Sequence, residues 1–243
     1  HLEMHFEPAG VPNGKAGEAV REYISDMIET SSPVKSDICT FVNPDKFHHG
    51  LIMLLHMQHH LLSEGIGLRH LCDWAVFVNS FKGNEFETLF KERLKNVGLW
   101  TFAKTISLAA SIGIGLPKQE FMGGNTELAC STLNDIISGG NFGSKDKDRS
   151  GEGFFISNRG KDGVNHSRPV QFILSVNQIV YTNWKVTKRV KILLPIGWVY
   201  FGSRRFIREI TGKRKPMKFK KLYTSSKSRK ELYKQLHLFE TEC

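Results

Sequence analysis

Cysteine, long apolar runs and clustered carboxylates are all scarce in this sequence. The four cysteines, at positions 39, 72, 130 and 243, are widely spaced and form no CxxC pair. That spacing argues against a zinc knuckle or a disulfide framework and indicates a reducing, cytoplasmic setting. No apolar run reaches the roughly 20 residues of a membrane-spanning helix, so no transmembrane segment is predicted. Neither a GxxxxGK[ST] phosphate loop nor an HExxH zinc motif is present.

Positive charge is abundant, but it is confined to the end of the chain. Residues 181–243 hold 17 Lys and Arg against 4 Asp and Glu, whereas the other residues hold 17 against 20. The net charge of +10 is therefore a property of the C-terminal region. Such a region is a solvated basic surface or meets a polyanion: nucleic acid, an anionic membrane face or an acidic partner.

The first six residues alternate apolar and polar side chains, with Leu2, Met4 and Phe6 on one side. This alternation predicts a half-buried β-strand over residues 1–6. Since a lone strand is not stable, we expect its sheet partners to lie upstream, in sequence that is not part of this chain.

Apolar spacing at three and four residues predicts helices through most of the remaining sequence. The expected helices cover residues 16–29, 43–64, 68–81, 85–97, 100–111, 126–138, 170–186, 190–210 and 226–239. Asn43 is the expected N-cap of the second helix and Pro44 its first residue, while Gly65 ends it. Asn125 is the expected cap of the helix that follows it. The sequence predicts a mainly α fold, a helical array after one N-terminal strand.

Residues 139–166 are polar and rich in glycine, which predicts a flexible loop. Further on, residues 192–201 are apolar and flanked by Lys and Arg, but the run is too short to span a bilayer. Because Pro195 would kink a helix here, a buried bent helix that closes the core is expected. A helix lying at a membrane interface is the alternative.

Histidines are concentrated before Gly65. On a helix, His49, His56 and His60 share one face, with His59 beside them. The four-residue spacing of His56 and His60 is that of two metal ligands on one helix. A zinc site needs a third ligand, however, so structural histidines bonded to backbone or water are the expected case.

Arg69 and Asp73 follow on the next predicted helix. Their four-residue spacing fits a simple surface ion pair. Arg69 also lies in the first turn after Gly65-Ile-Gly67, where free N–H groups and the helix dipole favour an anion. An arginine at that place suits a phosphate.

Four segments together resemble a known family. They are His1-Leu-Glu-Met-His-Phe6, the histidine helix Leu54–Leu61, the joint Glu64-Gly-Ile-Gly-Leu-Arg-His-Leu-Cys-Asp-Trp74, and Leu193-Leu-Pro-Ile-Gly-Trp198. In order and spacing they resemble the uncharacterised bacterial nucleotidyltransferase-like proteins, remote members of the polymerase-β nucleotidyltransferase superfamily.

This resemblance implies transfer of a nucleoside monophosphate from a nucleoside triphosphate to an unidentified acceptor, with Mg²⁺. Glu3 matches the position of the family's third metal-binding carboxylate, and so is the candidate catalytic residue and metal ligand. Arg69 and His60 are the candidate phosphate and nucleotide contacts. The family's first two metal-binding carboxylates have no counterpart here, so the chain by itself is expected to be inactive.

The resemblance also implies a division of the chain. Residues 1–42 would be the remnant of the α+β catalytic domain, 43–138 a helical domain, 139–166 a flexible loop and 167–243 a basic helical region. Two alternatives stay open: a helical module whose basic C-terminal third binds nucleic acid or another polyanion, and a structural domain that binds zinc through His56, His60 and another histidine.

Overall fold

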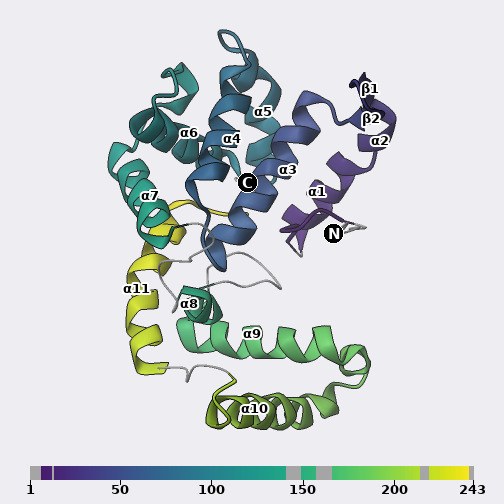
Figure 1. Cartoon of the computed structure of the whole chain (residues 1–243), viewed down its shortest axis with the longest axis vertical. Helices are drawn as coiled ribbons and strands as arrows, with labels where there is room; N and C mark the ends of the chain where they lie inside the picture. The colour runs from purple at the N-terminus through teal and green to yellow at the C-terminus, as the bar shows by residue number, and fades with distance from the viewer. Residues whose placement is uncertain (1–6, 13, 141–148, 157–165, 214–218, 241–243) are drawn as a thin grey trace.

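The computed structural model describes residues 7–12, 14–140, 149–156, 166–213 and 219–240. It confirms a mainly helical fold and adds a small antiparallel hairpin near the N-terminus (Figure 1). The strand predicted for residues 1–6 lies outside the described residues. In chain order the elements are α1 (Lys15–Ile24), α2 (Met27–Thr30), β1 (Ser32–Lys35), β2 (Thr40–Asn43), α3 (Lys46–Leu62), α4 (Leu68–Asn79), α5 (Glu85–Asn96), α6 (Trp100–Ile114), η1 (Glu120–Met122), α7 (Thr126–Gly139), α8 (Arg149–Ile156), α9 (Arg168–Asn183), η3 (Lys185–Lys188), η4 (Lys191–Leu193), α10 (Leu194–Ile210) and α11 (Phe219–Gln235).

An aromatic core joins helices α3 to α6 and the short helix η1. Phe86 stacks on Phe90 with ring centroids 4.5 Å apart and on Phe121 at 4.4 Å. Trp74 of α4 is fully buried, and its indole N–H donates to the Ser107 hydroxyl of α6 at 2.9 Å. A buried indole needs such a partner, so this bond fixes α4 against α6.

The start of α3 differs from the prediction by two residues. Asn43 ends strand β2, and the cap is Asp45, whose carboxylate accepts the backbone N–H of His48 at 2.9 Å. The expected Asn43 cap is therefore wrong, since sheet pairing takes that residue into the hairpin. The end of α3 is as expected: Gly65 adopts φ +96°, a conformation that favours glycine, and donates to the His60 carbonyl at 2.6 Å.

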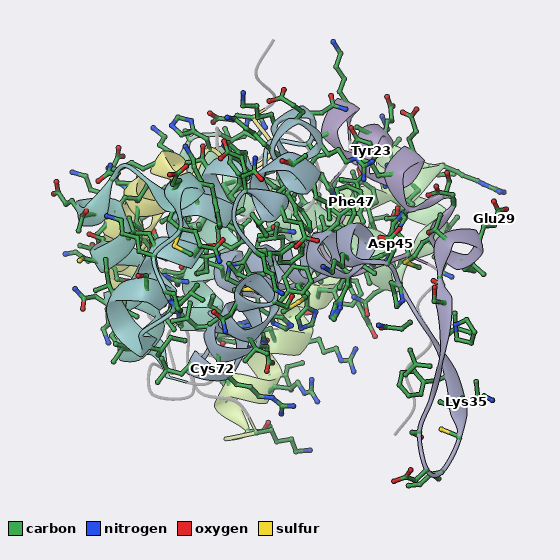
Figure 2. The ribbon with its side chains drawn as sticks, turned by 90° about the horizontal axis from the view of Figure 1, so that it is seen from above. Tyr23, Glu29, Lys35, Asp45, Phe47 and Cys72 are labelled. Carbon is green, nitrogen blue, oxygen red and sulfur yellow. The ribbon has the colours of Figure 1, made fainter. Side chains whose placement is uncertain are left out.

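A hairpin that the sequence analysis did not predict follows α1 and α2. The helix predicted for residues 16–29 is broken into α1 and α2, and Ser32 pairs with Asn43 in the register of β1 and β2. All residues of both strands are exposed. Figure 2 shows the hairpin, with Lys35 on it, projecting away from the helices.

Helix α8 corrects the prediction of a flexible loop over residues 139–166. Within that segment, residues 149–156 form a helix, and Arg149, Glu152 and Ile156 are buried. It packs mainly against α9 and α11. Tertiary packing therefore stabilises a helix that local composition does not predict.

The expectation of a buried, kinked helix over residues 190–210 is also wrong. Pro195 lies in the first turn of α10, where a proline replaces no hydrogen bond and causes no kink. Along α10 only Gly197 is buried, at the contact with Val180 of α9. In Figure 1, α9 and α10 lie side by side at one end of the molecule, and α11 runs from there towards α7.

None of the helices in the described part of the chain is long and apolar enough to cross a membrane. Cys39, Cys72 and Cys130 are free thiols, and Cys243 lies outside the described residues.

Candidate functional site

The joint between α3 and α4 gathers histidines from both helices. The His56 and His60 rings of α3 lie 4.5 Å apart, centroid to centroid, and His70 of α4 lies 5.7 Å from His56 and 5.9 Å from His60. His59 adjoins His60 at 5.5 Å. His49, the other member of the expected stripe, lies instead against Phe77 at 5.2 Å. The sequence thus places His56 and His60 correctly, and the fold adds His70.

The protonation of this cluster follows from its surroundings. The backbone N–H of Gly67 points at Nδ1 of His70 at 3.3 Å, so in the neutral ring Nε2 carries the proton. Desolvation lowers the pKa of His70, and the charge of His56 lowers it further. Desolvation also lowers the pKa of His56. At neutral pH both rings are therefore uncharged, since an ordinary histidine already titrates near pH 6.5.

Arg69 reaches solvent beside this cluster. Its side chain is 86% exposed, and its guanidinium lies 3.9 Å from the carboxylate of Asp73, which is 60% exposed. This is the surface pair that the four-residue spacing predicts, and pairs of this kind hold their partners weakly. The guanidinium is therefore placed to exchange Asp73 for another anion.

The metal-binding part of the sequence hypothesis receives no support from the fold. Glu3, the candidate catalytic residue and metal ligand, lies outside the described residues. Among the residues that the structure does describe, no three His, Cys, Asp or Glu side chains are grouped so as to hold a metal ion. His56, His60 and His70 thus lie close together without the arrangement that the zinc alternative requires.

Comparison with known proteins finds no matching family model, no matching curated protein and no matching solved structure. The resemblance to nucleotidyltransferase-like proteins therefore rests on the sequence motifs alone.

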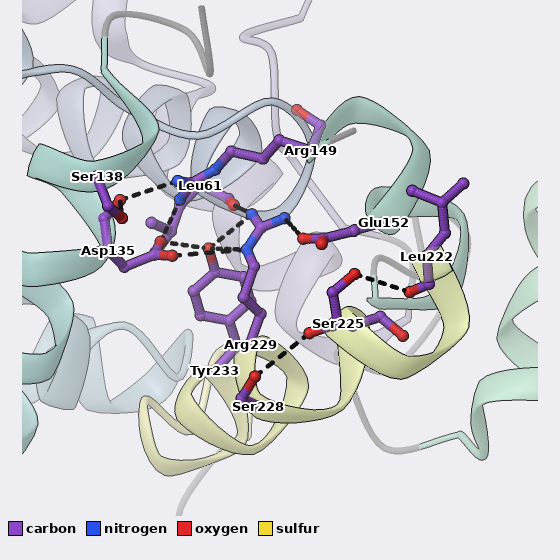
Figure 3. A network of polar contacts seen from close by, with 12 residues as sticks. Leu61, Asp135, Ser138, Arg149, Glu152, Leu222, Ser225, Ser228, Arg229 and Tyr233 are labelled. Carbon is purple, nitrogen blue, oxygen red and sulfur yellow. Dashed lines mark hydrogen bonds and ion pairs between the residues drawn. The ribbon is translucent and has the colours of Figure 1, made fainter. Parts of the chain in front are cut away.

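A second polar cluster, which the sequence did not indicate, lies where α7, α8 and α11 meet (Figure 3). Arg149 donates from Nη1 to the Asp135 carbonyl at 2.9 Å and from Nη2 to the carboxylate of the same residue. Arg229 donates to Glu152 Oε2 at 2.7 Å and to the Tyr233 hydroxyl at 2.9 Å. The Tyr233 hydroxyl in turn donates to Asp135 Oδ2 at 2.8 Å. We call these five residues the Arg149–Arg229 network.

The network is buried and electrically balanced. The exposed fractions of its charged side chains are 3% for Arg149, 10% for Asp135, 11% for Arg229 and 4% for Glu152. Burial opposes the charge on Arg229, but its acceptors outweigh that effect and raise its pKa. Burial raises the pKa of the Tyr233 hydroxyl, so the phenol stays protonated. With two cations answered by two anions, the network holds three helices together.

Two glycines make room for Arg149. A Cβ on Gly139 would lie 1.9 Å from Nη1 of Arg149, and one on Gly65 would lie 2.5 Å from its Nε. Gly65 therefore has two roles: it ends α3 and accommodates the buried guanidinium. In this way the network is joined to the histidine joint described above.

His48 is the histidine that the fold buries most clearly. Its Nε2 lies 2.7 Å from the Tyr23 carbonyl and 3.2 Å from Asp26, and its Nδ1 lies 3.0 Å from Asp45 and 3.3 Å from Thr30. Figure 2 shows Tyr23 and Asp45 beside this part of α3. These contacts tie α1 and α2 to α3, which is the structural role expected of a buried histidine.

Aromatic residues of the basic region contact neighbouring side chains, while Trp198, Tyr200 and Tyr223 stay partly exposed. Trp184 packs on Tyr200 at 5.2 Å, and the Trp198 indole donates to Asn177 at 2.9 Å. The guanidinium of Arg168 stacks on the Tyr223 ring at 3.9 Å. These rings therefore form part of the local packing of α9, α10 and α11.

Proposed function

We propose that this chain is the helical part of a nucleotidyltransferase-like protein, which transfers a nucleoside monophosphate from a nucleoside triphosphate to a hydroxyl acceptor. The motif resemblance motivates the proposal. The observation that carries it is the cluster of His56, His60 and His70 at the Gly65–Gly67 joint, with exposed Arg69 next to His70 in the chain.

In this proposal the joint contacts the triphosphate. Arg69 supplies a full positive charge and a planar set of N–H donors, which suits phosphate oxygens. His60 supplies a further polar contact beside it. Mg²⁺ would be bound by Glu3 together with carboxylates that this chain does not contain, so no catalytic step is assigned to the described residues.

The first test is the activity of the purified chain. Incubation with a labelled nucleoside triphosphate, Mg²⁺ and candidate acceptors should give no nucleotidyl transfer, since two of the three metal-binding carboxylates are missing. Measurable transfer would show that the assignment of the metal site is wrong.

The second test is phosphate binding at the joint. Titration with inorganic triphosphate, followed by NMR of the imidazole and guanidinium signals, should shift His60 and Arg69. Arg69→Ala and His60→Ala should each weaken binding by about tenfold or more, the value expected for a hydrogen bond to a charged group. Lys118→Ala, which removes an exposed cation after α6, is the matched control. Equal effects of Arg69→Ala and Lys118→Ala would eliminate the proposed contact.

A second candidate function is polyanion binding by the basic C-terminal region, nucleic acid included. The observation that favours it is the exposure of Lys185, Lys188, Arg189 and Lys191 in the segment that leads into α10. Binding of this kind weakens steeply with salt, because each phosphate contact releases counterions. A binding constant that does not change with salt would rule it out.

A further inference from the structure

Helix α10 presents an apolar stripe to solvent, which Ser203 interrupts midway. The stripe consists of Ile196, Val199, Phe206, Ile207 and Ile210. They are spaced by three, seven, one and three residues, so they share one face of a helix. Val199 and Ile210, for example, are 72% and 69% exposed. An exposed apolar surface of this length marks an interaction site.

The opposite face of α10 packs against α9. A Cβ on Gly197 would lie 2.4 Å from Val180 of α9, and Phe201 and Arg205 follow it at four-residue intervals and are half-buried. Figure 1 shows α10 at the outer edge of the molecule, with α9 between it and α8. The stripe therefore points away from the body of the protein.

Charge limits what can cover the stripe. Residues 185–210 carry seven Lys and Arg and one acidic residue, Glu209. Glu209 is already paired with Arg205 at 2.8 Å. A second copy of the chain packed through the same face would bring the two basic segments together, and like charges repel. The occupant must be negatively charged.

The side chains of the stripe favour a lipid surface over nucleic acid as the partner. Proteins that bind single strands use aromatic rings on which bases stack. Trp198 and Tyr200 are 40% and 47% exposed, but the Trp198 indole is hydrogen-bonded to Asn177 and the Tyr200 ring packs on Trp184. The residues of the stripe itself are mainly branched aliphatic side chains. Such side chains gain free energy by entering hydrocarbon, whereas bases offer them no comparable partner.

We propose that α10 lies in the plane of an anionic membrane. The apolar stripe enters the boundary between headgroups and acyl chains, and Arg204, Arg208 and the Lys and Arg of residues 185–191 contact lipid phosphates. The helix lies on the bilayer and does not cross it. Membrane binding by α10 does not depend on nucleotidyl transfer. The anionic bilayer is the polyanion that the basic region would bind in the second candidate function.

The test is sedimentation of the chain with lipid vesicles of two compositions, phosphatidylcholine alone and phosphatidylcholine with phosphatidylglycerol. Binding should require phosphatidylglycerol and should weaken as salt rises, since surface charges are screened. The triple substitution Ile196→Ser, Val199→Ser and Ile210→Ser should reduce partitioning at least tenfold. Because these side chains are exposed, the circular dichroism spectrum and unfolding midpoint should stay unchanged.

A matched control removes exposed apolar side chains elsewhere: Val76→Ser, Ile112→Ser and Ile137→Ser, on α4, α6 and α7. It should leave partitioning unchanged. Absence of vesicle binding, equal binding to both compositions, or equal losses in the two triple variants would overturn the proposal. Salt-sensitive binding to RNA or DNA without vesicle binding would overturn it in favour of nucleic acid. A concentration-dependent dimer abolished by the α10 substitutions, without vesicle binding, would assign the stripe to a second copy.

Discussion

Replacing Arg229 by methionine should destabilise the protein far more than the same replacement at Arg69. The Arg229 side chain is 11% exposed and bonds Glu152, Tyr233 and the Leu61 carbonyl. Without it, the buried carboxylates of Asp135 and Glu152 would face only one remaining cation, Arg149. Removing one partner of a buried ion pair costs about 3–5 kcal/mol, because it leaves a charge without compensation.

That cost can be measured as a shift of the whole unfolding transition. In a protein of this size a change of 1 kcal/mol moves the melting temperature by roughly 2–4 °C, so Arg229→Met should lower it by roughly 6–20 °C. Urea unfolding, followed by far-ultraviolet circular dichroism, gives the free energy directly. Arg69→Met is the control, because an exposed arginine paired at 3.9 Å should contribute no more than about 0.5 kcal/mol.

A double variant distinguishes an unpaired charge from simple loss of packing. Combining Arg229→Met with Glu152→Gln removes both members of one ion pair in the Arg149–Arg229 network. The combined loss should be smaller than the sum of the separate losses by about 0.5–3 kcal/mol. Additive losses, or an Arg229→Met variant as stable as Arg69→Met, would show that the network does not act as a charge-balanced unit.

Three further predictions concern the histidine joint, the glycine beside the network and the α3 cap. The pKa values of His56 and His70 in the folded protein lie below the unfolded value of about 6.5, so the unfolded chain binds more protons as the pH falls. The free energy of unfolding should therefore be highest above about pH 6.5 and decrease below it. His70→Gln should reduce this pH dependence, measured by urea unfolding at a series of pH values. Gly139→Ala should cost about 1.5–3 kcal/mol by displacing buried Arg149, whereas Gly202→Ala in α10, with open space around it, should stabilise by about 0.5–1 kcal/mol. Asp45→Ala should cost about 1 kcal/mol through the lost α3 cap, and Asn43→Ala, at the position first expected to be the cap, should cost less.

Much of the fold follows from local sequence. Helices α4 to α7 begin and end within a few residues of their predictions, and Asn125 caps α7 by accepting the Leu128 N–H at 3.0 Å. In these segments the apolar spacing and the capping residues predict the same helix boundaries. The hairpin and the α3 cap were missed because Asn43 can serve either a strand or a helix start, and sheet pairing decides between them.

Helix α8 could not be predicted in the same way. Its sequence contains Gly151 and Gly153, which weaken a helix and predict a loop. A Cβ on Gly151 would lie 2.9 Å from Leu222 of α11, so this glycine permits a close approach of the two helices. That benefit depends on a residue far along the chain and leaves no signal in the local pattern.

In the candidate site, too, some positions follow from local sequence and others depend on tertiary packing. The positions of His56, His60 and Arg69 on adjacent helices follow from periodicity and the glycine joint, and the ion pair of Arg69 with Asp73 was expected from spacing. His70 was not singled out, because its place beside His56 depends on the angle between α3 and α4. The outward direction of the α10 stripe likewise depends on which face α9 covers, and periodicity alone cannot decide that.

The Arg149–Arg229 network has a consequence for how the protein is made. Tyr233 lies 98 positions after Asp135, the carboxylate that it bonds. At ordinary rates of synthesis, about 5–20 residues per second, the ribosome needs roughly 5–20 seconds to travel from one to the other. During that time Asp135, Arg149 and Glu152 carry an excess negative charge that has no Arg229 to balance it. The α7 and α8 region should therefore stay open, and accessible to chaperones and proteases, until α11 leaves the ribosome.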